Sequence, residues 1–284
     1  MKKKHNRPRR LNVYDGNSQS RKVKAPEYEF LKQRPSPEKE VSKDIRLNKY
    51  IANSGICSRR EADKLIESGD IKVNGKTIEE LGYKIKPSDK VQYKGKVIKN
   101  EKFIYVLLNK PKDFITTTKD PQNRKTVIDL IKNHIDERVY PVGRLDRNTT
   151  GLLLLTNDGE LSEILSHPSY NIRKVYEVLL DNPLDEEDFI RIKSGLELDD
   201  GPVRVDEIAI ISPDAKLIGL EIHSGRNRIV RRIFSELGYD VNRLDRVMYS
   251  FLTKKDLPRG KWRFLKEHEV VRLKHLGKGK HKKQ

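Results

Sequence analysis

Apolar and polar positions follow two regimes along the chain, with short helical stripes and strands up to residue 98 and longer buried strands after residue 103. In the first regime Leu47, Tyr50 and Ile51 fall on one face of a helix. Ser54-Gly55 should end that helix, because glycine readily adopts the left-handed conformation of a C-terminal cap. The pattern therefore predicts a short amphipathic helix immediately before Gly55.

A second helix is predicted directly after the first. Ser58, with Glu61 three residues later, has the pattern of a capping box, and Ala62, Leu65 and Ile66 form the buried face. After this helix the pattern changes to short strands separated by tight turns, which predicts a small β-sheet. The expected strands lie at residues 71–73, 90–93 and 96–98, and Asn74-Gly75 forms one of the turns.

The stretch from Val142 to Gly159 is the most informative part of the second regime. A polar turn carrying one acid, Asp146, runs directly into four leucines at 152–155 and leaves through an Asn-Asp-Gly turn. Such a short apolar run between turn signals predicts a strand buried on both faces. A loop that ends in a buried strand holds its side chains rigidly, which suits a catalytic carboxylate. On spacing alone, the simpler interpretation is that Asp146 only bonds backbone amides in its own turn.

The rest of the pattern predicts an α+β fold, with a larger domain built on a mixed, mostly antiparallel β-sheet with flanking helices. The expected strands are residues 103–108, 174–180, 203–211 and 217–222, and the expected helices are residues 127–135, 160–165, 185–192 and 229–237.

Charge divides the chain further. The net charge is +18, to which residues 1–44, 45–100 and 274–284 contribute +7, +6 and +5, whereas residues 101–273 are neutral. Basic flanks around a neutral body predict that binding to a polyanion and chemistry are divided between different parts of the chain. We expect domains at 45–100 and 101–273 and disordered basic tails at 1–44 and 274–284, the first tail serving either for solubility or as an RNA tether.

Several classes of protein are disfavoured. Cys57 is the only cysteine, so no intramolecular disulfide or cysteine-rich zinc site is expected. The seven histidines are scattered without metal-ligand spacing, so no metal is expected. No apolar run approaches the roughly 20 residues that span a bilayer, and the basic N-terminus lacks the apolar segment of a secretory signal. We therefore expect a cytoplasmic protein without membrane contact.

The stretch around Asp146 resembles a known signature. Gly143-Arg144-Leu145-Asp146, followed by Thr150-Gly151 and the leucines, is similar to the motif of the pseudouridine synthases that modify ribosomal RNA. The resemblance is strongest to the group that contains small-subunit synthase A and large-subunit synthase B. It implies that Asp146 is the indispensable catalytic residue. Arg243-Leu244-Asp245 repeats the tripeptide but lacks the preceding glycine and a following apolar strand, so we assign the role to Asp146 only.

Other segments extend this resemblance. Asn109-Lys110-Pro111 is similar to the first motif of the family, and Lys174-Val175-Tyr176-Glu177 to the segment whose tyrosine packs against the target base. On pattern alone, Tyr176 is an ordinary strand residue. Residues 223–232 resemble the third motif, whose arginine, here Arg231, pairs with the catalytic aspartate through its planar, permanently charged fork. Most synthases carry Gln or Glu where this chain has Ile229.

Residues 45–98 resemble an S4 RNA-binding domain. The matching segments are residues 46–50, 55–62 and 73–76. Basic residues gather near the starts of the two expected helices, where helix dipoles and exposed amides attract phosphate. Any one of them would be an ordinary solvated charge, but four together predict an RNA contact. They are Arg46, Lys49, Arg59 and Arg60, and the resemblance to the synthases adds Arg144, which fills the gap left by an extruded base, and Arg226.

Together the resemblances imply site-specific isomerisation of uridine to pseudouridine in ribosomal RNA, on an extruded uridine and without a cofactor. Asp146 either attacks C1′ of the ribose or removes a sugar proton. The closing segment 257–263 and Gly225-Arg226-Asn227-Arg228 favour 23S over 16S RNA as the target, either free or in a precursor particle. We expect a monomer. The alternative class is a non-catalytic S4-type ribosome assembly protein, and no glycine-rich nucleotide loop supports a different S4-bearing enzyme.

Overall fold

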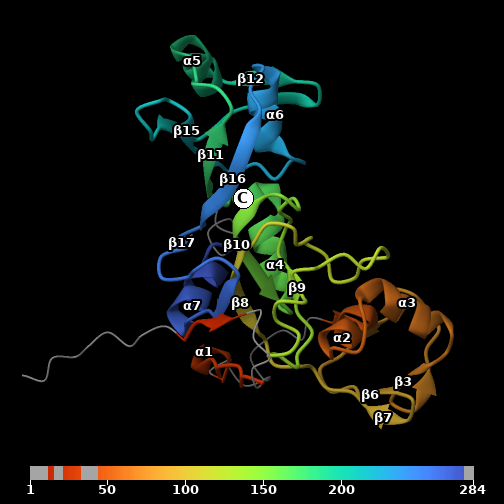
Figure 1. Ribbon diagram of the computed structural model, residues 1–284. Coiled ribbons are helices and arrows are strands. Elements are labelled where there is room, and N and C mark those ends of the chain that lie inside the picture. The colour runs from red at the N-terminus through yellow and green to blue at the C-terminus, as the bar shows by residue number, and fades with distance from the viewer. Residues whose placement is uncertain (1–11, 16–21, 33–43, 278–284) are drawn as a thin grey trace, which may run out of the picture. The chain divides into compact units, whose positions relative to one another are not determined.

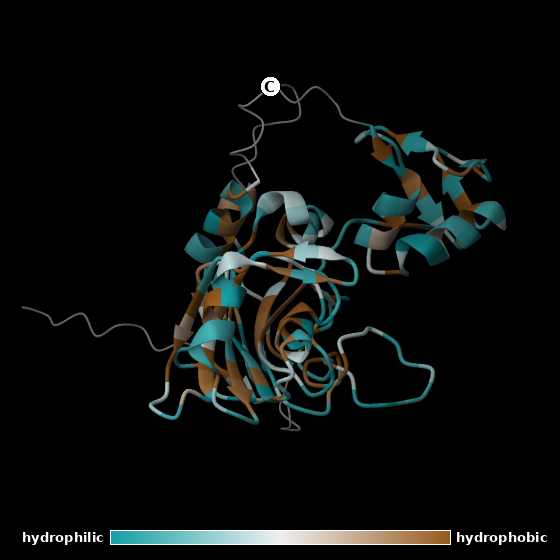
Figure 2. Ribbon diagram, turned by 90° about the horizontal axis from the view of Figure 1, so that it is seen from above, coloured by the Kyte–Doolittle hydropathy of each residue, from teal (hydrophilic) through white to brown (hydrophobic). Residues whose placement is uncertain are grey.

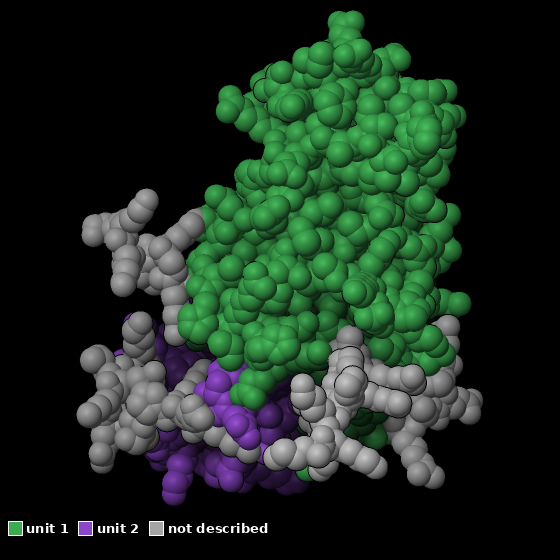
Figure 3. Space-filling view, turned by 90° about the vertical axis from the view of Figure 1, so that its left-hand side faces the viewer, with its two compact units in different colours: residues 1–25, 105–284 green, residues 26–104 purple. Residues whose placement is uncertain are grey.

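The computed structural model describes residues 12–15, 22–32 and 44–277. They form two compact units, shown in separate colours in Figure 3: residues 26–104, and residues 1–25 together with 105–284. The boundary falls at 104/105 rather than at the expected 100/101, because Glu101 remains attached to the smaller unit by a backbone hydrogen bond to Asn53.

The two helices predicted for the smaller unit are confirmed. They are α2 (Leu47–Asn53) and α3 (Arg59–Glu67), which pack on each other. Gly55 has the predicted left-handed backbone, with φ of +77°. The capping box at the start of α3 is present, with the Ser58 hydroxyl accepting from the backbone of Glu61 and the Glu61 carboxylate accepting from the backbone of Ser58.

The strands of the smaller unit share a buried core with these helices. A four-stranded antiparallel sheet has the order β4-β3-β6-β7, and β2 pairs with β5 in a separate ribbon. Residues from both helices and the strands form one buried cluster that includes Leu47, Ile51, Ile66 and Ile71. The unit also contains α1 (Glu29–Lys32), and its strands are β2 (Ile45–Arg46), β3 (Ile71–Val73), β4 (Lys76–Thr77), β5 (Lys84–Ile85), β6 (Val91–Tyr93) and β7 (Lys96–Val97).

The larger unit is built on a ten-stranded sheet (Figure 1), as the predicted α+β class requires. Its strand order is β1-β18-β8-β10-β16-β11-β15-β14, with β9 paired to β10 and β17 to β16. Among these described strands β10 and β16 run parallel, and the other neighbours are antiparallel. The strands are β1 (Tyr14–Asp15), β8 (Tyr105–Lys110), β9 (Tyr140–Pro141), β10 (Thr150–Thr156), β11 (Lys174–Leu180), β14 (Glu207–Ile210), β15 (Leu217–Ile222), β16 (Val241–Tyr249), β17 (Leu252–Thr253) and β18 (Lys261–Phe264).

Four α-helices accompany this sheet: α4 (Gly159–Ser166), α5 (Glu186–Ser194), α6 (Ile229–Glu236) and α7 (Glu267–His275). A 3-10 turn, η1 (Pro168–Tyr170), follows α4, and a hairpin of β12 (Leu196–Leu198) and β13 (Gly201–Val203) follows α5. The helix α6 packs against β16 and β12, and α4 packs against α7.

The centre of the core is the predicted leucine strand. Every residue of β10 is buried, and the four leucines 152–155 have no exposed surface. β8 on one side is equally buried, and brown, apolar segments lie inside the larger unit in Figure 2. Gly151 permits β16 to approach on the other side, because a Cβ at this position would lie 2.3 Å from the carbonyl oxygen of Arg246. The loop that contains Asp146 therefore leads into a strand that is buried along its whole length.

The predicted helix at residues 127–135 is wrong. This segment forms a series of turns. Backbone hydrogen bonds to the residue three positions earlier, such as Asp129 N–H to Thr126 O, are mixed with bonds to the residue four positions earlier. The Asp129 carboxylate also accepts from the backbone and hydroxyl of Thr126. The β-branched residues at 127, 128 and 131 favour a helix weakly, and Val127 and Ile131 are buried here without one.

Both tails contain more structure than expected. Tyr14 and Asp15 pair with β18, and the Tyr14 ring stacks on Trp262 with ring centroids 4.6 Å apart. At the other end, α7 continues past residue 273 to His275, and Lys274 Nζ lies 2.6 Å from Asp158 Oδ2. The expectation of disordered tails is therefore wrong at 12–15, at 29–32, where α1 forms, and at 274–275. Residues 1–11, 16–21, 33–43 and 278–284 lie outside the described residues.

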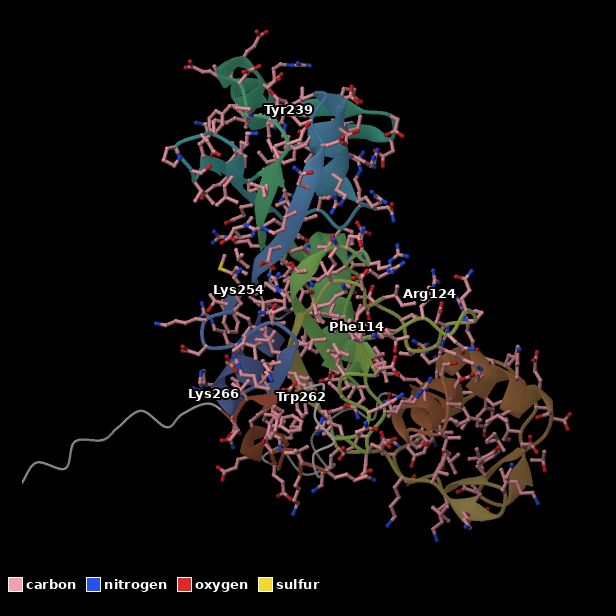
Figure 4. The ribbon with its side chains drawn as sticks, in the orientation of Figure 1. Phe114, Arg124, Tyr239, Lys254, Trp262 and Lys266 are labelled. Carbon is pink, nitrogen blue, oxygen red and sulfur yellow. The ribbon has the colours of Figure 1, made fainter. Side chains whose placement is uncertain are left out.

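The tripeptide Arg243-Leu244-Asp245 lies inside a strand that the pattern did not predict. β16 is the longest strand described and occupies the middle of the sheet, between β10 and β11. Asp245 is 3% exposed and is paired with Lys254 Nζ at 2.8 Å and Arg259 Nη2 at 2.7 Å. Three charged residues in the middle of β16 hide the apolar alternation that identifies a strand in sequence. Lys254 is labelled in Figure 4.

Candidate active site

Asp146 lies in the loop that leads into β10, and hydrogen bonds from several directions fix this loop. The Thr116 hydroxyl donates to the carbonyl of Leu145 at 3.0 Å, and the Thr149 amide donates to the carbonyl of Asp146 at 3.1 Å. The Asp146 side chain is 36% exposed, so it faces the surface from a constrained backbone.

Lys110 supports the same loop from inside the protein. Its ammonium group donates to the carbonyls of Thr149 at 2.7 Å, Pro111 at 3.1 Å and Arg147 at 3.2 Å. The side chain is completely buried, and this burial lowers the pKa of Lys110 to about 8, although the negative charge of Asp146 opposes the fall. Lys110 therefore links the first family-like segment to the loop that carries the carboxylate.

Two arginines of the third family-like segment reach Asp146 from the start of α6. The Nε atom of Arg231 lies 3.9 Å from Asp146 Oδ2, and the Nε atom of Arg228 lies 4.0 Å from the same oxygen. Arg228 occupies the N-cap position of α6 with a left-handed backbone, φ +47°, which directs the chain into the helix. Burial lowers the pKa of Arg231 and the charge of Asp146 opposes this, but a guanidinium stays charged at physiological pH.

A cavity of about 140 Å³ opens beside this carboxylate. Pockets for drug-sized ligands measure roughly 300–1,000 Å³, so this one is suited to a smaller group such as a single base. Tyr176 on β11 lines it and is 8% exposed. The remaining wall combines apolar and cationic groups, among them Ile229, Val230, Leu244, Tyr249, Lys174 and Arg246.

A wider groove of about 560 Å³ adjoins the cavity and shares Arg144 and Asp146 with it. The groove is lined by the loop at residues 115–124 and by segments 143–147 and 225–228. Arg124, labelled in Figure 4, lies on the first loop and is held by two side-chain hydrogen bonds to Asp120 at 2.7 and 3.1 Å. A small cavity that opens into a broad basic groove can hold one base together with a polymer backbone.

The candidate RNA-binding residues of this unit differ in their surroundings. Arg144 is exposed and lines both the cavity and the groove. Arg226 also lines both, but its guanidinium donates to the carbonyls of Pro202 at 2.8 Å and Gly201 at 3.0 Å and pairs with Asp200. Arg226 thus fixes the β12–β13 hairpin to the segment before α6, and its contact with RNA stays a prediction.

The candidate residues of the smaller unit lie where the pattern placed them. Arg46 and Lys49 flank the start of α2, and Arg59 and Arg60 form the first turn of α3. Arg46, Arg59 and Arg60 are exposed. Their binding to RNA stays a prediction.

Sequence reasoning missed Arg228, Lys174 and Arg246, which line the cavity, and Lys110, which supports the loop around Asp146. Arg228 and Lys110 stand inside segments that had been singled out, so a charge count within those motifs could have found them. Lys174 begins β11 and donates to the carbonyls of His223 at 2.7 Å and Ile172 at 3.0 Å, and its burial lowers its pKa to about 8. Arg246 had no sequence signal, because β16 was not predicted.

The described residues contain neither a cluster of metal ligands nor a membrane-spanning helix. No group of three or more His, Cys, Asp or Glu side chains is placed to hold a metal ion. None of the described helices combines the length and the apolar character that a membrane-crossing segment requires.

Comparison with known proteins defines the class to which this site belongs. Residues 104–236 match the RNA pseudouridylate synthase family and residues 45–91 match the S4 domain. The first match contains Asp146, Tyr176 and Arg231, and the second contains the four basic residues at α2 and α3. The chain belongs to the RNA pseudouridine synthase family, and it is an RNA-modifying enzyme with an S4 RNA-binding domain.

Individual relatives cover most of the chain. It is 43% identical to the ribosomal large subunit pseudouridine synthase B of Bacillus subtilis, over 81% of this chain and 96% of that protein. It is also 43% identical to an uncharacterized RNA pseudouridine synthase of Aquifex aeolicus, over 81% of this chain and 94% of that protein. A crystal structure of a pseudouridylate synthase, 28% identical, superposes with a TM-score of 0.56 over 81% of this chain and 99% of the other.

Proposed function

We propose that this enzyme converts a specific uridine of 23S ribosomal RNA to pseudouridine, with Asp146 as the catalytic group. The observation that carries the proposal is the Asp146 carboxylate itself. It stands at the mouth of a base-sized cavity, 3.9 Å from Arg231 and 4.0 Å from Arg228. Two cations therefore face the carboxylate on which the reaction depends.

The reaction breaks the bond from N1 of uracil to C1′ of the ribose and joins C1′ to C5 instead. The C5 proton is removed and N1 gains a proton, so atoms and electrons balance without an oxidant, reductant or energy source. Asp146 either forms a bond to C1′ as N1 leaves, and this bond breaks when C5 joins C1′, or it removes a sugar proton to start the same cleavage and returns that proton when C5 joins C1′. Either route needs a carboxylate held beside the sugar. The hydrogen bonds within the loop around Asp146 hold the carboxylate in place.

The detached base must turn without escaping. The apolar, aromatic and cationic side chains that line the cavity retain the base, while Tyr176 covers its face. Because a uridine inside folded RNA cannot reach this cavity, the enzyme extrudes it, and Arg144 at the rim takes the place that the base leaves in the RNA. Tyr176 also assists removal of the C5 proton.

RNA binding is divided from this chemistry. The groove beside the cavity receives the backbone next to the target, through Arg144 and Arg226. The S4 domain holds another part of the RNA through its phosphates, with Arg46, Lys49, Arg59 and Arg60. One chain supplies both functions, so we propose a cytoplasmic monomer that acts on free ribosomal RNA or on a precursor particle.

The choice of 23S RNA rests on the relative that is named as a large-subunit synthase B. The 16S RNA is the alternative target. To test both, the purified enzyme is incubated with unmodified 23S and 16S transcripts, and pseudouridine is mapped by chemical labelling and primer extension. One new site in 23S RNA is expected. A site in 16S RNA alone would overturn the target, and no site in either transcript or in precursor particles would overturn the activity.

A further inference from the structure

Arg246 has a buried cationic nitrogen without a partner, in the wall of the candidate active site. The residue is 3% exposed, and its Nε donates to the carbonyl of Leu152 at 2.7 Å. Its Nη2 is buried and has no hydrogen-bond partner among the described residues. A buried donor without a partner destabilises the folded protein by its desolvation penalty, and this penalty is larger for a charged group. The position of Arg246 Nη2 therefore calls for an explanation.

The position of Arg246 in the sheet gives that explanation. On β16 it stands opposite Tyr176 of β11 on one side and Gly151 of β10 on the other. Its guanidinium lies over the ring of Tyr249, 4.6 Å from the centroid, and both residues line the 140 Å³ cavity. The hydrogen bond to Leu152 and the ring of Tyr249 hold the guanidinium in place before any ligand arrives.

We propose that Arg246 donates from Nη2 to a carbonyl oxygen of the target uracil, and thereby recognises the base and stabilises the negative charge that it carries once N1 has left C1′. The inference rests on the proposed function. Uracil presents two carbonyl acceptors, and the charge on the detached base spreads onto both. A donor that is already fixed in position is most effective where charge develops, because no rearrangement is needed during the reaction. The assignment holds for both routes open to Asp146.

A contact to O4 of the uracil also distinguishes uridine from cytidine. Cytosine has an amino group in place of one uracil carbonyl, so at that position it presents a donor to the guanidinium. A site built around a hydrogen bond rejects a base that leaves its buried polar group unpaired.

The test compares Arg246→Met with the unchanged enzyme in single-turnover assays at saturating RNA. Methionine keeps an unbranched apolar stem and removes every donor. We expect the rate to fall about 10²-fold or more, as when one donor to a developing charge is removed, while RNA affinity changes little. Arg246→Lys, which keeps the charge, should recover part of the loss. A rate for Arg246→Met within about threefold of the unchanged enzyme would overturn the proposal.

Sulfur-substituted RNA separates base contact from a purely structural role. Synthetic RNAs carry uridine, 2-thiouridine or 4-thiouridine at the mapped site, and sulfur accepts hydrogen bonds less well than oxygen. One thio-substitution should slow the unchanged enzyme and have no added effect on Arg246→Met. Equal slowing of both enzymes by each substitution would show that Arg246 only supports β16, and would overturn the contact.

Arg243→Met is the matched control, since Arg243 lies on the same strand but is exposed. It should keep the single-turnover rate at saturating RNA, and a loss there equal to that of Arg246→Met would overturn the assignment. Melting temperatures establish that each variant is folded. Failure of the unchanged enzyme to modify any RNA would be a failure of the proposed function, whereas an active Arg246→Met would contradict this inference alone.

Discussion

The guanidinium of Arg231 joins Asp146 to the backbone of the central strand. Its Nε lies 3.9 Å from Asp146 Oδ2, while its Nη1 donates to the carbonyl of Val241 at 2.7 Å. Val241 is the first residue of β16. Because one side of the fork is fixed to the sheet, the other side presents its charge to the carboxylate in a constant position. The pairing therefore depends on the loop at Asp146, on α6 and on the start of β16.

Asp146→Asn should abolish pseudouridine formation. The amide keeps the size of the side chain but can neither attack C1′ nor accept a sugar proton. Since the side chain is 36% exposed and lies outside the buried core, stability should change by less than about 1 kcal/mol. Pseudouridine mapping measures the activity, and a filter-binding assay and a melting curve check RNA affinity and folding. Activity above background would contradict the assignment of Asp146.

The two arginines beside Asp146 form a matched pair for a second test. They lie at nearly equal distances from the carboxylate, but the Arg231 side chain is 19% exposed and that of Arg228 is 58% exposed. Solvent and salt screen an exposed charge more strongly than a buried one. Arg231→Gln should therefore lower the single-turnover rate about 10²-fold, and Arg228→Gln by less than about tenfold. The reverse order would show that burial does not determine their effect on Asp146.

Tyr176 offers a test of its two proposed contributions. Tyr176→Leu removes the ring and should weaken the binding free energy of the base by about 1–3 kcal/mol, the usual value of base stacking on an aromatic side chain. Tyr176→Phe keeps the ring and removes only the hydroxyl, so it should leave RNA affinity unchanged. If the hydroxyl assists removal of the C5 proton, the single-turnover rate of Tyr176→Phe falls about 10²-fold or more. An unchanged rate would limit Tyr176 to covering the base.

Local patterns predicted much of this protein because they depend on neighbouring residues. The capping box at Ser58 and Glu61, the cap at Gly55 and the leucine strand each follow from a few consecutive positions, and all are present. The resemblance to the synthases singled out Asp146 and Arg231, which the structure brings together. Their catalytic and pairing roles stay proposals.

Features that depend on tertiary structure could not be predicted in this way. β16 carries charges that would be unfavourable in an isolated buried strand, and it is tolerated because Asp245 is paired with Lys254 and Arg259. Those partners are specified 9 and 14 residues later in the chain. Arg246 and Tyr176 are neighbours because β16 pairs with β11, and this pairing is not visible in the sequence.

Lys110 predicts a pH dependence whose sign follows from its lowered pKa. Its pKa falls from the ordinary value of 10.5 to about 8 in the folded protein. Between these values the unfolded chain binds more protons at this site than the folded protein does, so its contribution to stability increases as pH rises through this window. Below pH 8 the folded protein must keep a buried charge at this site, and that cost is fully present.

Lys110→Met removes this dependence and is the variant that measures it. The free energy of unfolding of both proteins is determined by urea titration at several values between pH 7 and pH 10.5. We expect the stability of the unchanged protein, relative to that of Lys110→Met, to be lowest near pH 7 and to increase steadily above pH 8. Other lysines titrate equally in both proteins and cancel in the difference. A difference that is constant over this range would mean that Lys110 keeps its ordinary pKa, and that its three hydrogen bonds to the loop around Asp146 fully compensate for its burial.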